Sequence, residues 1–72
     1  MTEQSIYVRA IVAYLKSDGA ETPADVPRPH EVWHEGRRYV RMEAQGDTVA
    51  VYRVTNRGQL RRMRRWPKEV AA

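Results

Sequence analysis

Apolar residues in the first part of the chain recur at the spacing of an α-helix. At 100° per residue, Arg9 and Lys16 fall on one side of a helix spanning residues 3–17. Thr2 is the expected N-cap, and Gly19 stands where a C-terminal glycine cap belongs. The same stretch is rich in residues that favour strands, so an extended segment is the alternative. The opposite side of the helix forms a continuous apolar arc: Tyr7, Val8, Ile11, Val12, Tyr14 and Leu15.

The pattern changes after residue 17. Residues 18–30 contain three prolines and read as a connector that sustains neither a helix nor a central strand. From residue 31 to residue 66, short β-favouring segments alternate with turn signals at Gly36, Gly46 and Gly58, which predicts a β-meander. Its last segment, residues 59–66, is ambiguous, because Leu60, Met63 and Trp66 also recur at a helical spacing. We expect a strand there, because a turn after a strand most simply returns the chain beside it.

These elements predict one small α+β domain. One N-terminal helix is expected to pack on a three- or four-stranded antiparallel β-meander, with residues 67–72 as a tail. A small all-β barrel is the alternative if the first segment is extended. The helix arc of Tyr7, Ile11, Val12 and Leu15 is expected to cover one face of the sheet. That face is expected to bear Val40 and Met42, with some of Val49, Val51, Tyr52 and Val54.

Size and composition narrow the classes of protein. A chain of 72 residues has a thin core and little room for a deep pocket, so self-association as a homodimer is an option. It contains no cysteine, which excludes disulfides, thiolate metal sites and cysteine nucleophiles. No apolar run reaches the roughly 20 residues of a membrane span, and the first residues lack the basic start of a signal peptide. We therefore expect a cytoplasmic protein with no membrane role.

Positive charge is concentrated in the last third of the chain. The first 52 residues hold six basic groups against eight acidic ones, for a net charge of −2, whereas the whole chain has a net charge of +4. Between Arg53 and Lys68 there are six arginines, one lysine and no acid. A concentrated basic segment attracts polyanions, and the arginine guanidinium matches the geometry of phosphate.

A second motif, His30-Glu31-Val32-Trp33-His34, has the H-E-x-x-H spacing of zinc proteases. That chemistry requires a helix that places both imidazoles on one face, whereas the neighbouring prolines and Gly36 predict a strand. On a strand the two histidines lie roughly 13 Å apart, too far for one metal ion. No nucleophile with an evident base and no glycine-rich phosphate loop appears elsewhere. We therefore expect a non-enzymatic protein without a metal or cofactor.

The basic segment predicts an accessory or regulatory module that binds nucleic acid. Arginines would hold phosphates while an aromatic ring stacks on bases. Arg37 and Arg38 would extend this surface if their strand neighbours the others, and Trp33 and Tyr39 would add aromatic rings. The alternative is a protein-interaction module, with an acidic partner or a second copy of the chain, that uses exposed tryptophans. The expected nucleic-acid-binding residues are Arg53, Arg57, Arg61, Arg62, Arg64, Arg65, Lys68 and Trp66.

Overall fold

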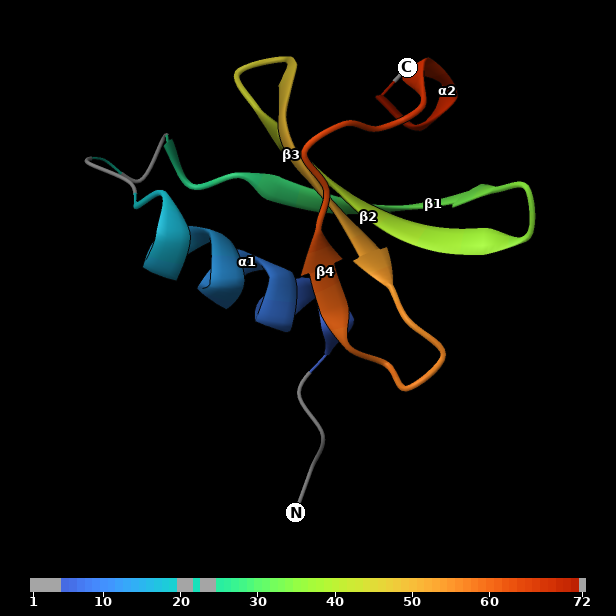
Figure 1. Ribbon diagram of the computed structural model, residues 1–72. Coiled ribbons are helices and arrows are strands. Elements are labelled where there is room, and N and C mark those ends of the chain that lie inside the picture. Colours follow the sequence, from blue (N-terminus) through green and yellow to red (C-terminus); the bar gives the residue numbers. More distant parts are fainter. Residues whose placement is uncertain (1–4, 20–21, 23–24, 72) are drawn as a thin grey trace.

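The computed structural model describes residues 5–19, 22 and 25–71. Its element order is α1 (Ile6–Ser17), β1 (Arg28–His34), β2 (Arg37–Ala44), β3 (Asp47–Val54), β4 (Leu60–Arg62) and α2 (Lys68–Ala71). The strands form one open antiparallel sheet in the order β1-β2-β3-β4, so each strand pairs with its neighbour in sequence. Helix α1 lies on one face and α2 on the other (Figure 1). The predicted α+β fold is confirmed, and the sheet is not closed into a barrel.

Helix α1 is bounded by two caps. The Ser5 hydroxyl accepts a hydrogen bond from the Tyr7 N–H at 3.1 Å, which satisfies one of the amides that a helix start leaves unpaired. Gly19 follows the last turn with φ +75° and donates to the Tyr14 carbonyl at 3.3 Å, as expected for a glycine cap. The helix thus begins at Ile6 rather than at residue 3, and Thr2, the predicted cap, lies outside the described residues.

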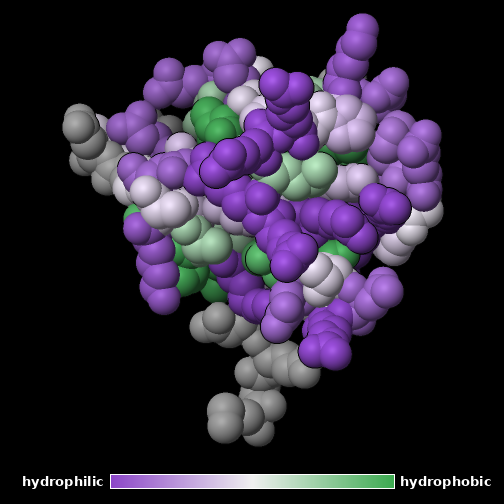
Figure 2. Space-filling view, in the orientation of Figure 1, coloured by the Kyte–Doolittle hydropathy of each residue, from purple (hydrophilic) through white to green (hydrophobic). Residues whose placement is uncertain are grey.

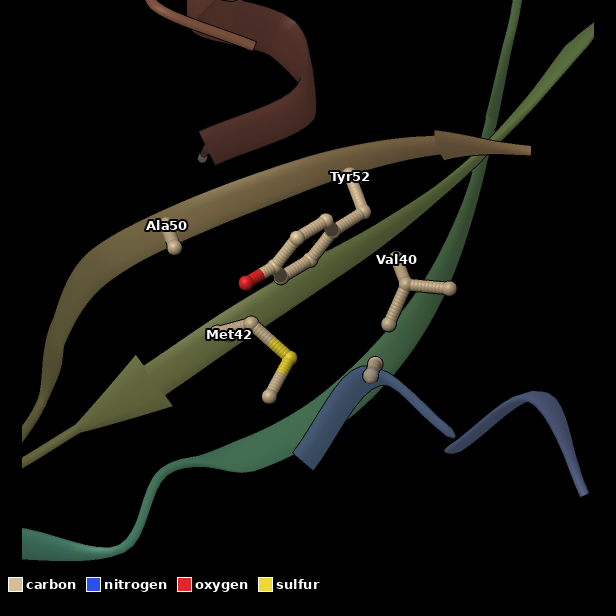
Figure 3. Close-up of a cluster of buried hydrophobic side chains, with 5 residues drawn as sticks. Val40, Met42, Ala50 and Tyr52 are labelled. Carbon is tan, nitrogen blue, oxygen red and sulfur yellow. The ribbon is translucent and has the colours of Figure 1, made fainter. Parts of the chain in front are cut away.

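The first core lies between α1 and the sheet, and it corrects the predicted rotation of the helix. The residue of α1 that is fully buried is Ala10, which belongs to one cluster with Val40, Met42 and Tyr52. Figure 3 shows the side chains of these three sheet residues. Because alanine has almost no side chain, the helix backbone lies close to the sheet, and the large side chains of β2 and β3 fill the space between them. Two residues of the predicted apolar arc, Ile11 and Tyr14, do pack against this core, whereas the other four are exposed: Tyr7, Val8, Val12 and Leu15. Only part of the arc therefore faces the sheet, and the predicted rotation of the helix is wrong for the rest.

The second core lies on the other face of the sheet. Tyr39, Val51 and Val70 are buried there, with Met63 and Trp66 packed against them. Val51 thus belongs to the face opposite α1, whereas the other sheet residues expected under the helix do pack on the first core. The predicted tail contains the short helix α2, whose Val70 closes this second core.

Two strand boundaries differ from the sequence prediction. β1 begins at Arg28, within the predicted connector, because Pro29 is tolerated on an edge strand whose outer side needs no ladder hydrogen bonds. β4 is confirmed as a strand but ends at Arg62, with Met63 still donating to the Val51 carbonyl at 3.0 Å. The chain then bends and reaches α2 through Pro67. In the part of the chain that the structure describes, no helix is long and apolar enough to span a bilayer.

Candidate functional site

The predicted basic residues lie on the surface along β3, β4 and the segment that leads to α2. The seven cationic side chains between Arg53 and Lys68 are all exposed. Hydrophilic side chains spread across the face of the molecule that β4 and the following segment cross (Figure 2). Secondary structure, however, divides these residues into groups with different surroundings.

Arg53 and Arg61 form the closest group. They are direct partners in the register of β3 and β4, so both side chains emerge on the face that carries Tyr39 and α2. Directly opposed residues of this kind have Cβ atoms about 5 Å apart, and like charges in such a pair destabilise the sheet. Among the described residues, the arginine ion pairs are made by Arg38, Arg41 and Arg62, and neither Arg53 nor Arg61 takes part in one. The two exposed guanidiniums form a local concentration of positive charge that is open to an anion.

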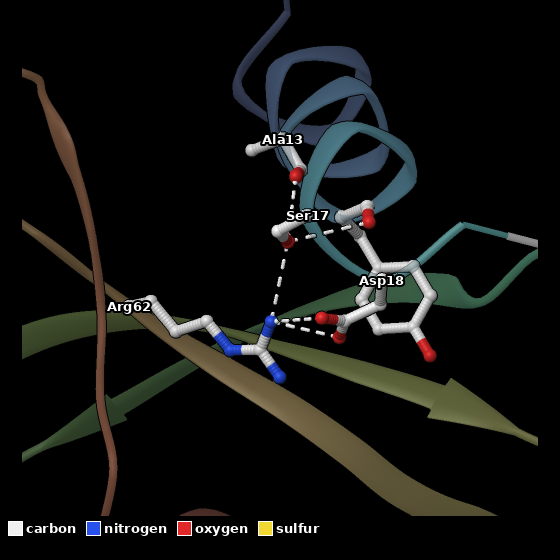
Figure 4. Close-up of polar contacts among 5 residues, drawn as sticks. Ala13, Ser17, Asp18 and Arg62 are labelled. Carbon is white, nitrogen blue, oxygen red and sulfur yellow. Dashed lines mark hydrogen bonds and ion pairs between the residues drawn. The ribbon is translucent and has the colours of Figure 1, made fainter.

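Arg62 points to the other face, where it joins β4 to the end of α1 (Figure 4). Its Nη1 group donates to Asp18 Oδ1 at 2.7 Å and to the Ser17 hydroxyl at 3.3 Å, and it forms an ion pair with Asp18 Oδ2, also at 2.7 Å. Its guanidinium carbon lies 6.0 Å from the centre of the Tyr14 ring. The hydrogen bond from Arg62 holds the pKa of the Asp18 carboxyl below its ordinary value of 3.8, and the same bond raises the pKa of Arg62. The positive charge of Arg62 is thus already matched inside the domain.

The buried phenol of Tyr52 lies beneath this cluster. Tyr52 is the register partner of Arg62, and its hydroxyl is buried without a hydrogen-bond partner among the described residues. Burial raises the pKa of Tyr52 above its ordinary value of 10.0, so the phenol is neutral at physiological pH. It contributes bulk to the core rather than charge to the surface.

Trp66 has a mixed environment. It is half-buried against the second core, and together with Arg62, Met63 and Arg64 it lines an open hollow of about 530 Å³. Its ring is therefore only partly available to a ligand. Arg57 lies in the β3–β4 turn, while Arg65 and Lys68 follow β4, so none of these three belongs to the paired strands that carry Arg53 and Arg61.

Trp33 is the aromatic residue that the structure presents to solvent most openly. Its side chain is 63% exposed on β1. The indole Nε1–H donates to Glu31 at 3.0 Å, and the second oxygen of Glu31 accepts from Arg38 Nε at 2.6 Å. These donors, with Trp33 contributing most, lower the pKa of the Glu31 carboxyl below its ordinary value of 4.5. The Glu31 carboxylate thus holds the orientation of an exposed ring.

Arg37 and Arg38 were predicted as extensions of the basic surface, and Trp33 as an additional ring there or, in the alternative prediction, as part of an exposed patch for protein interaction. Because β2 lies between β1 and β3, Arg37 and Arg38 do come beside Arg53. Tyr39, expected as an additional exposed ring, is instead buried in the second core. Strand alternation in β1 puts Trp33 and Val32 on opposite faces of the sheet, and Val32 packs against the second core. Alternation could therefore predict the face of Trp33, but only the structure shows that α1 does not cover it.

The two histidines lie on the edge strand rather than on a helix. His30 Nε2 is 3.9 Å from a Glu43 carboxylate oxygen, and His34 Nε2 is 4.0 Å from Glu35. Within the described ranges, no three histidine or acidic side chains come close enough together to hold a metal ion. The H-E-x-x-H spacing thus occurs here on a strand and not on a helix, which would place both imidazoles beside one zinc ion.

The arrangement offers exposed guanidiniums on one face of the sheet, two tryptophans with different exposure and open hollows beside each of them. These are features of an anion-binding surface. The chain matches no protein-family model, no curated protein and no solved structure.

Proposed function

We propose that this protein is a non-enzymatic accessory or regulatory module that binds nucleic acid through the basic surface of β3, β4 and the segment before α2. The observation that carries the proposal is the direct opposition of Arg53 and Arg61 across two strands. The two like charges repel each other and destabilise the free domain, whereas a phosphate bound between them would be attracted to both guanidiniums. Arg64 and Arg65 extend the same positive field.

The test is a fluorescence-anisotropy titration with short labelled single-stranded and duplex DNA and RNA, at low and near-physiological salt. In the test variant, Arg61, Arg64 and Arg65 are replaced by glutamine while Arg62, which ties β4 to α1, is kept. We expect an affinity at least ten-fold lower than that of the parent. The slope of log affinity against log salt should fall by about 2 to 3, because each phosphate contact contributes roughly 0.7 to 0.9 to this slope.

The matched control removes the same number of positive charges elsewhere, by replacing Arg9, Lys16 and Arg28 with glutamine. If binding depends on the proposed surface, this control retains most of the parent affinity. Equal losses in the two triple variants would mean that net charge rather than a site attracts the nucleic acid. Absence of binding at physiological salt in the parent would refute the proposal.

The exposed apolar face of α1 favours a second candidate function, self-association. Val8, Val12 and Leu15 are 46%, 40% and 39% exposed and follow the i, i+4, i+7 spacing of one helix stripe. A second copy of the chain presents the same stripe, and a two-fold pairing of these helices would bury both, which suits a domain with a thin core. Sedimentation equilibrium tests this. A concentration-dependent dimer that Val12→Asp converts to monomer would support it, and a monomer at high concentration would refute it.

A further inference from the structure

The two hairpins of the sheet separate at their tips. Pairing between β2 and β3 ends at Tyr39–Arg53, whereas β1 and β2 remain paired as far as His34–Arg37 and the β3–β4 turn extends beyond Val54. In Figure 1 the β1–β2 turn (green) and the β3–β4 turn (orange) accordingly end at separate points. Between them lies a hollow of about 330 Å³, which we call the tip cleft. Its lining includes Trp33, Arg37, Arg38, Arg53 and Asn56.

One side of the tip cleft is aromatic. Trp33 and Arg38 are register partners and lie on the α1 face of the sheet, beyond the part that the helix covers. The indole N–H is satisfied by Glu31 at 3.0 Å, and Arg38 holds that carboxylate from its other side. The ring of Trp33 is therefore oriented before any ligand arrives, which reduces the entropy lost on binding.

The other side of the tip cleft is cationic. Strand alternation places Arg37 and Arg53 on the α2 face, and both side chains are exposed. None of the described residues that line the cleft carries a carboxylate, and the charge of the third lining arginine, Arg38, is matched by its ion pair with Glu31. Arg37 and Arg53 therefore give the cleft an unbalanced positive charge, to which Arg61 adds from the neighbouring strand.

An aromatic ring and two guanidiniums across a small cleft match the two chemical parts of a nucleotide. A base can stack on an indole, and its phosphate can bind between arginines. The volume of about 330 Å³ is at the lower end of the range for small-molecule pockets. A base inside a duplex is stacked on its neighbours and presents only its edges in the grooves, so it cannot lie against Trp33. The cleft therefore favours an unpaired nucleotide.

We propose that the tip cleft holds one unpaired nucleotide of a single-stranded nucleic acid, with its base on Trp33 and its phosphate between Arg37 and Arg53. The proposal rests on the nucleic-acid-binding function and specifies the form of the ligand. The single strand crosses the end of the sheet from the α1 face to the α2 face. There it continues toward Arg61 and the basic segment that follows β4.

The test uses Trp33 as its own reporter. In a Trp66→Phe background Trp33 is the one remaining tryptophan, and its fluorescence is titrated with eight-nucleotide single-stranded DNA and RNA. Anisotropy with labelled single strands and duplexes then compares this background with Trp33→Ala, Trp33→Phe and Arg37→Gln/Arg53→Gln. We expect single strands to quench Trp33. Trp33→Ala should weaken single-strand binding about 5- to 150-fold, the range for loss of one stacked base.

Duplex affinity should change little in Trp33→Ala, and Trp33→Phe should recover most of the single-strand affinity because it keeps an aromatic face. The double arginine variant should weaken single-strand binding and lower its salt slope. Trp33, Arg37 and Arg53 are exposed, whereas Trp66 packs against the second core, so circular dichroism is used to check that the Trp66→Phe background and each variant made in it are folded.

An unchanged single-strand affinity in Trp33→Ala, or an equal loss for single strands and duplexes, would overturn the tip-cleft proposal. If the Arg61, Arg64 and Arg65 variant still loses binding in that case, the nucleic-acid function stands and only the cleft is refuted. If the parent binds none of the nucleic acids, both proposals fail.

Discussion

The opposition of Arg53 and Arg61 across β3 and β4 leads to a prediction in which stability and binding change in opposite directions. The perturbation is Arg61→Glu, which replaces a like-charge pair by an opposite-charge pair at the same register position. Cross-strand ion pairs contribute roughly 0.2 to 1 kcal/mol, and exposed pairs fall in the same range. Both side chains are exposed, so we expect a gain of about 0.5 kcal/mol, with about 1 kcal/mol as the upper limit.

For a domain of this size, 1 kcal/mol corresponds to a change of roughly 4 to 8 °C in Tm. Thermal unfolding followed by circular dichroism should therefore show Arg61→Glu melting about 2 to 8 °C above the parent at low salt. The gain should shrink as salt is added, because exposed charges are screened. Affinity for nucleic acid should fall in the same variant, since a phosphate contact is replaced by a negative charge.

The matched control is Arg64→Glu. It makes the same change in charge at an exposed position beyond the last paired residue of β4, where no opposite residue faces it in the register. This variant should lose affinity without gaining stability. If Arg61→Glu is no more stable than Arg64→Glu, the two arginines do not interact across the strands. If Arg61→Glu binds as tightly as the parent, Arg61 is not part of the interface.

Two further predictions concern the ties between α1 and the sheet. Asp18→Asn should lower stability at neutral pH by at most about 1 kcal/mol, because the pair with Arg62 is partly exposed. The pKa of Asp18 is lowered from 3.8, so its contribution is present above that pH and is lost as the pH falls through the lower folded pKa. Urea unfolding between about pH 5 and pH 2 should thus show a smaller acid loss in Asp18→Asn than in the parent. Met42→Ala should cost about 2 to 5 kcal/mol, since this side chain is fully buried under α1. Leu15→Ala, on the exposed face of the helix, should change stability by only about 0.5 kcal/mol, and a cost comparable to that of Met42→Ala would show that the helix is rotated toward its apolar arc.

The fold was predictable where local signals agree. Turn glycines separate strands of alternating pattern, and in the structure Gly36, Gly46 and Gly58 all have positive φ in the turns between neighbouring strands. The rotation of α1 was not predictable from its own apolar arc. It depends on the side chains that β2 and β3 direct toward the helix. Ala10 and Ala13 pack against them together with Ile11 and Tyr14, whereas Val8, Val12 and Leu15 are left exposed.

The candidate site was predictable as a charged segment but not as a geometry. Both Arg61 and Arg62 were expected to bind nucleic acid. In the structure Arg61 lies beside Arg53, whereas Arg62, on the opposite face, pairs with Asp18. Trp66 was the expected ring because it stands among the arginines, yet it is half-buried in the second core. The more exposed ring, Trp33, comes from a segment distant in sequence, and it lies near Arg53 only because β2 pairs with both β1 and β3.

The order of the strands also bears on how the domain acquires its structure. Every strand pairs with its neighbour in the chain, so the sheet forms by closing short loops, which is the condition for rapid folding. The bond between Ser17 and Arg62, in contrast, joins residues 45 positions apart and has to wait until β4 is in place. We therefore expect the transition state to resemble the hairpins, with α1 docking afterwards. Until that step the buried surface of Met42 and Tyr52 is open to solvent, and the nascent sheet is exposed to association with other chains.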